Sequence, residues 1–436
     1  MTVFLRVLTA ITGLLLAALA WERLVVEKTM GPVAVASLVL LGGVFVVLLV
    51  LLRFAQTGRR ELVGKILLVV GSTVVSYLAV DLIAGLILIR PLSPPLVPDQ
   101  YRHHKMVPNS FSSFHQRDFN YVQRVNNLGM RGPDVQVDKP ANAYRILMLG
   151  DSFTMGKGVE DDQTFSVLLQ GALRSRVTAC GGHRSVEVLN GGSDSYAPIL
   201  SYIQLTRDLA PLRPDMIVLN LDVSDLVQEA AYRSQAVFGP DGAPLGVPQV
   251  AREQSLTERI RTWTDHHLFL TRALLFYLLE RADYQEITVR NVVEQANAIV
   301  TAHTLVGDTE PRDKQWHDIF DSISRIKAYA DQHGAAFLLS VYPWAHQLND
   351  REWVPGRDAF MPRDAKPSDA SMNSIRTLSG ELGIELLDLY PAFRAYQGGK
   401  PLYFQYDMHW TTAGHEVAAK GIEEYLSNRF GAELCR

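Results

Sequence analysis

The sequence contains a serine in a setting typical of a catalytic nucleophile. Ser152 follows a short apolar segment with the pattern of a strand, Arg145–Gly150, and precedes a segment with helical spacing. At such a turn the Oγ can be exposed at the carboxyl edge of a sheet, and the backbone N–H can point at a developing oxyanion. Serine alone is a poor nucleophile and needs a base. The turn therefore indicates attack on a carbonyl if another segment supplies the base; the alternative is a serine that only caps the next helix.

The candidate base lies near the C-terminus, in the segment that opens the last predicted helix. His409 can accept the proton of Ser152, and Asp407, two residues earlier, can accept from the other imidazole nitrogen and fix the tautomer. The chain order is then Ser, Asp, His. A loop histidine with a purely structural role is the alternative for His409 taken alone.

Two other motifs do not fit this turn. A P-loop has the pattern GxxxxGK[ST], but the residue five before Gly156 is Asp151, and Lys157 is followed by Gly158. The α/β-hydrolase elbow GxSxG has glycine two residues after the serine, where this chain has Thr154. Neither phosphate binding nor that hydrolase fold is indicated.

The C-terminal part of the chain alternates between strand and helix patterns. This alternation predicts a three-layer α/β/α domain with a parallel sheet of about five strands, whose chemistry lies beyond the carboxyl ends of the strands. Between the third and fourth strands lies an insertion at about residues 226–314, with an amphipathic helical middle, Ser255–Glu280. We expect a helical cap on the domain; the alternative is a lid or a membrane-contacting surface. The expected strands are 145–150, 186–190, 216–221, 336–342 and 384–387, and the expected helices are 165–174, 199–209, 320–332, 370–382 and 414–430.

The N-terminal part is dominated by apolar residues. Segments at about 7–26, 32–52 and 62–89 predict an all-α transmembrane region of three helices, although the first also fits a signal peptide. The loop between the second and third segments is rich in arginine and lysine, so the positive-inside rule places it in the cytoplasm and everything after residue 89 outside. The predicted organisation is a transmembrane anchor at 1–90, a proline-rich linker and lead-in at 91–140, and an α/β domain at 141–436.

One acid interrupts the third apolar segment. Asp81 has no evident basic partner in the sequence. Ionisable residues within spans are enriched for function. The alternative is an acid that faces the other helices or lies near the interface.

Composition excludes several classes of protein. Of 436 residues, 47 % are hydrophobic and 20 % are charged, and the net charge is −4. A basic surface for nucleic acid is not indicated, and neither is intrinsic disorder. The two cysteines, Cys180 and Cys435, form no CxxC pair; both are predicted outside the cytoplasm, where disulfides persist, and we expect them to pair.

Histidine pairs and an acidic trio suggest no metal site. The pairs His103–His104 and His266–His267 are adjacent residues that do not share a helix face, so we expect surface or interface positions. Asp222, Asp225 and Glu229 follow the third strand; a cation or substrate site is possible in principle, but we expect a cap and turn network. No metal and no cofactor are expected.

The GDSF turn at 150–153 together with DMHW at 407–410 resembles the SGNH (GDSL) hydrolase superfamily. The resemblance covers about residues 126–430, including NNLGMRG at 126–132, VLNGGSDSYAP at 188–198, VLNLDVSDL at 218–226 and SVYPW at 340–344. It implies a serine esterase, a lipase or a polysaccharide O-acetyl esterase or acetyltransferase. The Asp-x-His spacing is similar to that of the alginate-type O-acetyltransferase branch.

Two positions depart from the family pattern. The glycine expected five residues after Asn190 is Ser195, and the asparagine expected before Asp225 is Ser224. The resemblance then implies an oxyanion hole formed by the N–H of Ser152, the N–H of Ser195 and the side chain of Ser224. Loss of one such donor can cost about 10²–10³ in rate.

These features predict a serine esterase anchored in the inner membrane by several spans, with its catalytic domain in the extracytoplasmic or periplasmic space. The expected substrate is an acylated glycan or lipid, with membrane lipid and an exopolysaccharide-assembly complex as partners. One alternative is an O-acetyltransferase with the same triad that acts on an extracellular polysaccharide. A second is a catalytically weak glycan-binding or assembly module, which the two serine departures favour. A small transporter is disfavoured by three spans and one unpaired acid.

Overall fold

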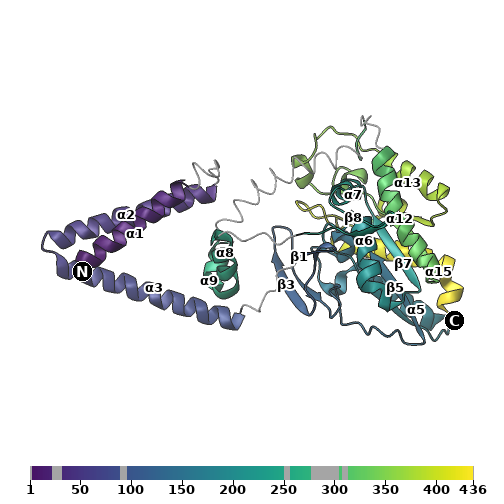
Figure 1. Cartoon of the computed structure of the whole chain (residues 1–436), viewed down its shortest axis with the longest axis horizontal. Coiled ribbons are helices and arrows are strands. Elements are labelled where there is room, and N and C mark those ends of the chain that lie inside the picture. Colours follow the sequence, from purple (N-terminus) through teal and green to yellow (C-terminus); the bar gives the residue numbers. More distant parts are fainter. Residues whose placement is uncertain are drawn as a thin grey trace. The chain divides into compact units, whose positions relative to one another are not determined.

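The computed structural model describes residues 2–21, 32–88, 96–249, 256–275, 304–306 and 313–435. The chain forms two compact units, Met1–Pro91 with Gln254–Val292, and Leu92–Glu253 with Val293–Arg436 (Figure 1). Part of the predicted insertion therefore belongs to the same unit as the N-terminal helices. The polypeptide passes between the two units three times.

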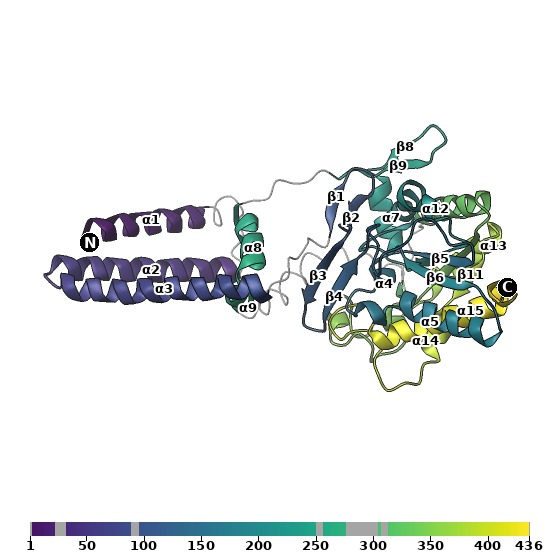
Figure 2. The same cartoon turned by 90° about the horizontal axis from the view of Figure 1, so that it is seen from below.

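The first unit is entirely helical in its described residues. Among these residues, Glu61–Ile87 is the one helical stretch long and apolar enough to cross a membrane; the described apolar stretches of the two preceding helices, Val3–Leu14 and Gly42–Gln56, are shorter. The amphipathic helix predicted over Ser255–Glu280 is described as far as residue 275, and Phe276 and Leu278 lie outside the described residues. The helices are α1 Thr2–Trp21, α2 Pro32–Gln56, α3 Arg60–Leu88, α8 Leu256–His267 and α9 Phe269–Leu275 (Figure 2).

The second unit contains a five-stranded parallel sheet with the order β11-β10-β7-β5-β6. The central strands consist almost wholly of buried apolar residues, because helices cover both faces. This confirms the predicted α/β architecture, and the strand bounds differ from the predicted ones by at most two residues. The strands are β5 Ala143–Leu149, β6 Ser185–Asn190, β7 Met216–Leu221, β10 Ala336–Val341 and β11 Leu386–Asp388.

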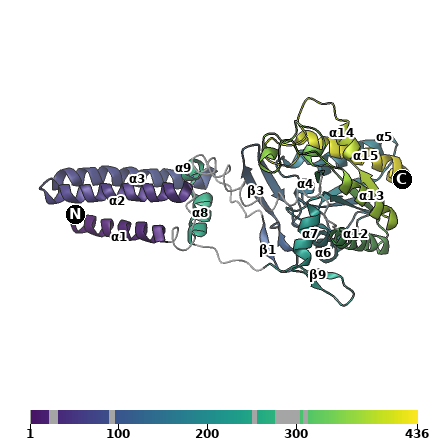
Figure 3. The ribbon, with the colours of Figure 1, turned by 90° about the horizontal axis from the view of Figure 1, so that it is seen from above.

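Side chains alternate between the two faces of the sheet, as strand geometry requires. Ile146 and Met148 pack with α5 and α15, whereas Leu147 and Leu149 pack with the helices of the opposite layer. The short helix α4, Ser152–Met155, follows β5 directly. The other helices of the unit are α5 Phe165–Ala179, α6 Pro198–Gln204 (extended by a π-helical turn, Leu205–Leu209), α7 Asp225–Arg233, α12 Asp313–Gln332, α13 Ala370–Glu381, α14 Tyr390–Arg394 and α15 Thr412–Leu434 (Figure 3).

Three antiparallel strand pairs lie outside the main sheet. Two of them occupy the segment expected as linker and lead-in, and the third lies at the start of the insertion. Four of these six strands have only two or three residues, which is too short for an alternation of apolar and polar residues to indicate them. The pairs are β1 Val97–Asp99 with β2 His103–Lys105, β3 Ser110–His115 with β4 Asn120–Val125, and β8 Val237–Phe238 with β9 Pro244–Gly246.

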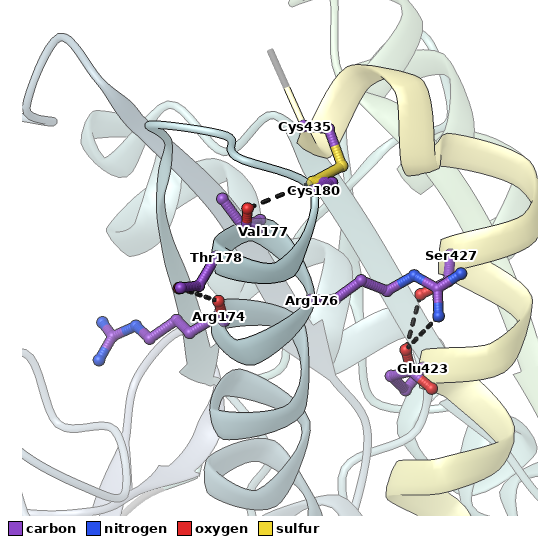
Figure 4. The surroundings of a disulfide bond; sticks show 8 residues. All are labelled: Arg174, Arg176, Val177, Thr178, Cys180, Glu423, Ser427 and Cys435. Carbon is purple, nitrogen blue, oxygen red and sulfur yellow. Dashed lines mark hydrogen bonds and ion pairs between the residues drawn. A yellow bond between two sulfur atoms is a disulfide. The ribbon is translucent and has the colours of Figure 1, made fainter.

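A disulfide bond joins the ends of two packed helices. Cys180, which caps α5, and Cys435, which caps α15, have their sulfur atoms 2.06 Å apart (Figure 4). Arg176 of α5 also pairs with Glu423 of α15, at 3.6 Å. The bond closes a loop of 255 residues. In the chain-entropy model, closing a loop this long disfavours the unfolded chain by about 5 kcal/mol.

Candidate active site

The turn after β5 fixes the position of Ser152. Gly150 has φ +144°, and a Cβ at this position would lie 2.9 Å from the carbonyl oxygen of Asn220, so the turn requires glycine. The Asp151 carboxylate accepts the N–H of Phe153 at 2.9 Å and caps α4. Ser152 is thereby held as the first residue of α4, at the carboxyl end of a central strand.

The structure brings Ser152, His409 and Asp407 together. Ser152 Oγ lies 2.7 Å from His409 Nε2, across a sequence separation of 257 residues. His409 Nδ1 contacts Asp407 Oδ1, which also accepts the backbone N–H of His409 at 2.9 Å. Because an ionised carboxylate only accepts, Nδ1 carries the hydrogen, and Nε2 is left to accept from the serine hydroxyl. Burial alone would raise the pKa of Asp407, but His409 lowers it to about 2, so this carboxylate is ionised at neutral pH.

A second aspartate, which the sequence analysis did not identify, holds the Asp407 loop. Asp118 lies in the turn between β3 and β4, and its Oδ2 accepts the N–H groups of Tyr406 and Asp407, each at 2.7 Å. Burial raises the pKa of Asp118, and these two hydrogen bonds oppose the rise. The only signal in the sequence is an acid in a short turn, which does not reveal a partner almost 290 residues away.

A buried arginine holds the segment that follows α4. Arg131, within the NNLGMRG lead-in, donates from its guanidinium to the carbonyl oxygens of Met155 at 3.2 Å and Val159 at 2.5 Å, and also to that of Gly156. It pairs with Asp161 at 2.8 Å. The lead-in thus fixes the path of the chain after the nucleophile.

Ser195 adopts a backbone conformation that favours glycine. Its φ is +58°, in the left-handed region, which accounts for the glycine that the family has at this position. Tyr232 donates to the Ser195 carbonyl oxygen at 3.0 Å. Within the described residues, the backbone N–H groups of Ser152 and Ser195 donate to no other group of the protein. Both N–H groups are therefore available to an incoming oxygen.

His104 of β2 fixes the turn that contains Ser195. Its Nε2 lies 2.6 Å from the Asp194 carbonyl oxygen, and its own carbonyl oxygen accepts the Tyr196 hydroxyl at 2.7 Å. A carbonyl oxygen only accepts, so His104 Nε2 carries a hydrogen. Nδ1 of neutral His104 is then the acceptor in its 2.9 Å contact with His103 Nδ1, which must donate. Burial lowers the pKa of both histidines.

The expected surface position is therefore wrong for His104, which is buried. In the second pair, His267 is exposed and stacks on Trp263, with ring centroids 4.9 Å apart. The side chain of His266 lies outside the described residues. In the described part of the chain, no group of three or more histidine, cysteine or acidic side chains is arranged to hold a metal ion.

Ser224 lies at the start of α7, next to Asp222. Its backbone N–H donates to the Asp222 carboxylate at 2.6 Å. Asp225 in turn accepts the N–H of Asp222 at 2.9 Å. Burial raises the pKa of both aspartates. The expected turn network is present, and Ser224 takes part in it through its backbone N–H.

Glu229 belongs to a separate buried network on α7. It accepts the N–H of Ile199 at 2.8 Å and the Ser322 hydroxyl at 2.5 Å, and it pairs with Arg233 at 3.5 Å. Burial raises its pKa to about 7. This carboxyl group supports the packing of α7 on α6 and α12, on the side of the sheet opposite α5.

A serine, a histidine and an aspartate in hydrogen-bonded sequence at the carboxyl edge of a parallel sheet define the class of serine-dependent acyl-transfer enzymes. Residues 308–434 match the family described as "SGNH hydrolase-like domain, acetyltransferase AlgX". The predicted SGNH resemblance is thereby confirmed, and with it the enzyme class, an SGNH-type ester hydrolase or O-acyltransferase. The matched residues include Asp407 and His409 but not Ser152.

Solved structures with similarity to this chain have low sequence identity to it. An acetylxylan esterase from Geobacillus stearothermophilus is 11 % identical, with 64 % of this chain and 93 % of that chain covered and a TM-score of 0.34. A lipolytic protein of the G-D-S-L family from Desulfitobacterium hafniense DCB-2 is also 11 % identical, with 64 % and 98 % covered and a TM-score of 0.33. An alpha/beta hydrolase from the metagenome of Lake Arreo is 13 % identical, with 65 % and 94 % covered and a TM-score of 0.34. Curated protein sequences give no match.

Proposed function

We propose that this protein is a membrane-anchored, extracytoplasmic serine enzyme that cleaves an acyl ester through an acyl-enzyme on Ser152. The observation that carries the proposal is the hydrogen-bonded sequence from Ser152 Oγ through His409 to Asp407, with 2.7 Å between the hydroxyl and the imidazole. Three groups from two distant segments meet in the order and orientation that acyl transfer requires.

The first half of the reaction forms the acyl-enzyme. Ser152 Oγ attacks the ester carbonyl carbon while its proton passes to His409 Nε2, and the carbonyl π electrons move to the oxygen. The ionised Asp407 stabilises the imidazolium that results. Collapse of the tetrahedral intermediate breaks the bond to the alcohol oxygen, which takes the proton from Nε2. The second half repeats these steps with a new hydroxyl as the nucleophile, and Ser152 regains its proton.

The oxyanion is stabilised by the N–H groups of Ser152 and Ser195. The Ser224 hydroxyl is a candidate third donor, but it is shorter than the asparagine amide of the family and rotates freely. Each donor of this kind is worth about 10²–10³ in rate. We therefore expect two main donors here, compared with three where asparagine replaces Ser224.

The acceptor of the acyl group distinguishes a hydrolase from a transferase. Water gives an esterase, and a sugar hydroxyl gives an O-acyltransferase. The matched family is named for an acetyltransferase, which favours acetyl as the acyl group and a hydroxyl as the acceptor. We propose an acylated glycan or lipid as the donor and, in the transferase form, an extracellular polysaccharide as the acceptor, with an exopolysaccharide-assembly complex as the partner.

We further propose that α1, α2 and α3 anchor the protein in the inner membrane by several spans. Arg53 lies in the last turn of α2 and Arg59 in the turn that follows it. Arg60 and Lys65, with the opposing Glu61, lie at the start of α3. The positive-inside rule then assigns this turn to the cytoplasm and the second unit to the outside. The paired Cys180 and Cys435 are consistent with an oxidising compartment.

A fluorophosphonate probe tests the nucleophile in the full-length protein in detergent. We expect labelling of the wild type, none of Ser152→Ala, and full labelling of Ser175→Ala, a control serine exposed on α5. No labelling of the folded wild type would refute the nucleophile and would favour the glycan-binding alternative. With a chromogenic acetate ester as donor, free acetate indicates a hydrolase, whereas acetylated oligosaccharide, detected by mass spectrometry, indicates a transferase.

A further inference from the structure

Asp81 of α3 binds the first turn of α9. This acid is 0 % exposed. Its Oδ1 accepts the N–H of Leu270 at 2.5 Å, and its Oδ2 accepts the N–H of Thr271 at 3.1 Å and the Thr271 hydroxyl at 2.5 Å. The acid that had no partner in the sequence is thus satisfied by residues almost 190 positions later.

Three residues of α3 form one stripe that fits this turn. Tyr77, Asp81 and Gly85 are spaced by four residues, so they share a helix face. The Tyr77 hydroxyl lies 3.0 Å from the Thr271 hydroxyl. A Cβ at position 85 would lie 2.0 Å from the His267 carbonyl oxygen, so the close approach of α8 requires glycine there. These two contacts lie one helical turn before and one turn after Asp81 on the same face of α3. The segment α8–α9 (Leu256–Leu275) therefore docks on this face through three successive turns.

The length of α3 indicates how deep this contact lies. Glu61–Ile87 has 27 residues. At 1.5 Å per residue it measures about 40 Å, compared with about 30 Å for the hydrocarbon core of a bilayer. Asp81 is six residues before Ile87, so it lies about 9 Å from the outer end of this stretch. The excess length therefore allows Asp81 to lie at the outer boundary of the hydrocarbon, where an acid costs much less than at the midplane.

α8 presents an apolar face that is at least half exposed in the described part of the chain. Leu256, Ile260 and Trp263 follow the i, i+4, i+7 spacing of one helix face and are 73 %, 56 % and 50 % exposed. Phe269, Leu270 and Leu274 continue the exposed apolar surface into α9. Thr264 and Leu268 are buried, and Arg259 is exposed. This combination of one docked face, one apolar face and a tryptophan is typical of a helix at a membrane–water interface.

We propose that α8–α9 lies in the outer membrane–water interface, fixed to α3 by Asp81, and that its exposed apolar face contacts lipid. A lipid bilayer is the partner that covers this face, because α8–α9 packs on α3, the described helix that is long and apolar enough to span a bilayer. The inference rests on the membrane placement proposed above, but not on the catalytic role of Ser152. Asp81 is then a structural acid that holds the insertion at a defined depth, and the expected cap on the α/β domain is instead a lipid-facing element.

Brominated lipids test the lipid contact in the full-length protein reconstituted into vesicles. Lipids brominated near the headgroup should quench tryptophan fluorescence, and part of this quenching should be lost in Trp263→Phe. The same part should remain in Trp316→Phe, a control in the second unit. Asp81→Leu should remove most of the Trp263 component, and Asp81→Asn, which keeps one acceptor oxygen, should remove less.

A cysteine pair tests the docking independently of lipid. In Tyr77→Cys/Thr271→Cys, a short bifunctional thiol reagent, which takes the place of the lost phenol ring, should form a cross-link detectable by mass spectrometry after proteolysis. The added Asp81→Leu change should reduce its yield several-fold. A cross-link without quenching of Trp263 would overturn the lipid contact, and a yield unaffected by Asp81→Leu would overturn the role of the acid. Release of the wild type from membranes without detergent would instead refute the proposed anchoring.

Discussion

The backbone at Ser195 leads to a specific prediction for Ser195→Gly. An L-residue in the left-handed region costs about 1–2 kcal/mol, and Ser195 is there with φ +58°. Glycine removes this cost but adds about 0.5–1 kcal/mol through the greater freedom of the unfolded chain. We therefore expect the variant to be more stable by about 0.5–1 kcal/mol.

Activity should survive the same substitution. The oxyanion donor at this position is a backbone N–H, which glycine retains, and the Tyr232 hydroxyl binds the carbonyl oxygen of residue 195, which is also unchanged. We expect kcat/KM for a chromogenic acetate ester to stay within about threefold of the wild type, a difference of less than 1 kcal/mol. Urea denaturation, followed by the loss of fluorophosphonate labelling, gives the stability of the catalytic unit.

Arg213→Gly is the matched control. Arg213 is exposed and also has a positive φ, +46°, but it lies before the amino end of β7, away from the carboxyl edge. It should give a similar gain in stability and no change in rate. The reasoning is refuted if Arg213→Gly stabilises the unit while Ser195→Gly abolishes turnover, because the Ser195 side chain would then take part in the chemistry.

Four further predictions concern the residues around the site. Asp407→Asn should lower kcat by about 10³–10⁴ because the amide cannot hold the required histidine tautomer; a smaller loss than tenfold would contradict the triad. His104→Phe removes the donor to the Asp194 carbonyl and should lower kcat about tenfold with little change in KM, whereas a purely structural role would lower stability alone. Burial raises the pKa of Glu229 to about 7, so the folded state binds one proton more than the unfolded state between about pH 4.5 and 7. The free energy of unfolding should therefore fall by about 3 kcal/mol as the pH rises through this range. Urea denaturation of Glu229→Gln should show a weaker dependence on pH. Replacement of Cys180 and Cys435 by serine should lower the free energy of unfolding by about 2–5 kcal/mol, and an unchanged urea midpoint would contradict the loop-closure argument.

The sheet and the triad follow from local patterns in the sequence. The core strands are mostly apolar, as in Met216–Leu221, where Asn220 is the one polar residue, and such runs are visible without knowledge of their partners. Parallel strands share one carboxyl edge, so a serine after β5 and a histidine after β11 are expected to approach each other. The proximity of Ser152 and His409 was predictable because the order of the strands, and not the sequence separation, determines the distance between these two residues.

The supporting residues were not predictable in the same way. The partners of Asp118, Arg131 and His104 are backbone groups far away in the sequence. Almost every residue type has the same backbone N–H and carbonyl groups, so the sequence does not show which of them will be bound. The hydrogen bond from the Ser224 backbone N–H to the Asp222 carboxylate also depends on the geometry of the turn. Likewise, Asp81 lacked a partner in the sequence because its partners are mostly the peptide groups of residues 270 and 271.

The three passages of the chain between the two units affect how the catalytic unit can be detached. A cut at the second or third connection leaves the two pieces joined by the Cys180–Cys435 disulfide, so the unit stays covalently attached to the N-terminal helices. A cut before Leu92 is the single cut that separates it covalently from α1–α3, and the docking of α8–α9 on α3 then holds the fragment without a covalent bond. A fragment that begins at Leu92 would retain Gln254–Val292 without α3, and would carry both the docked and the apolar faces of α8 into solution, where they promote aggregation. A catalytic fragment without these exposed faces would instead omit Gln254–Val292 and join the two parts of the second unit by a linker.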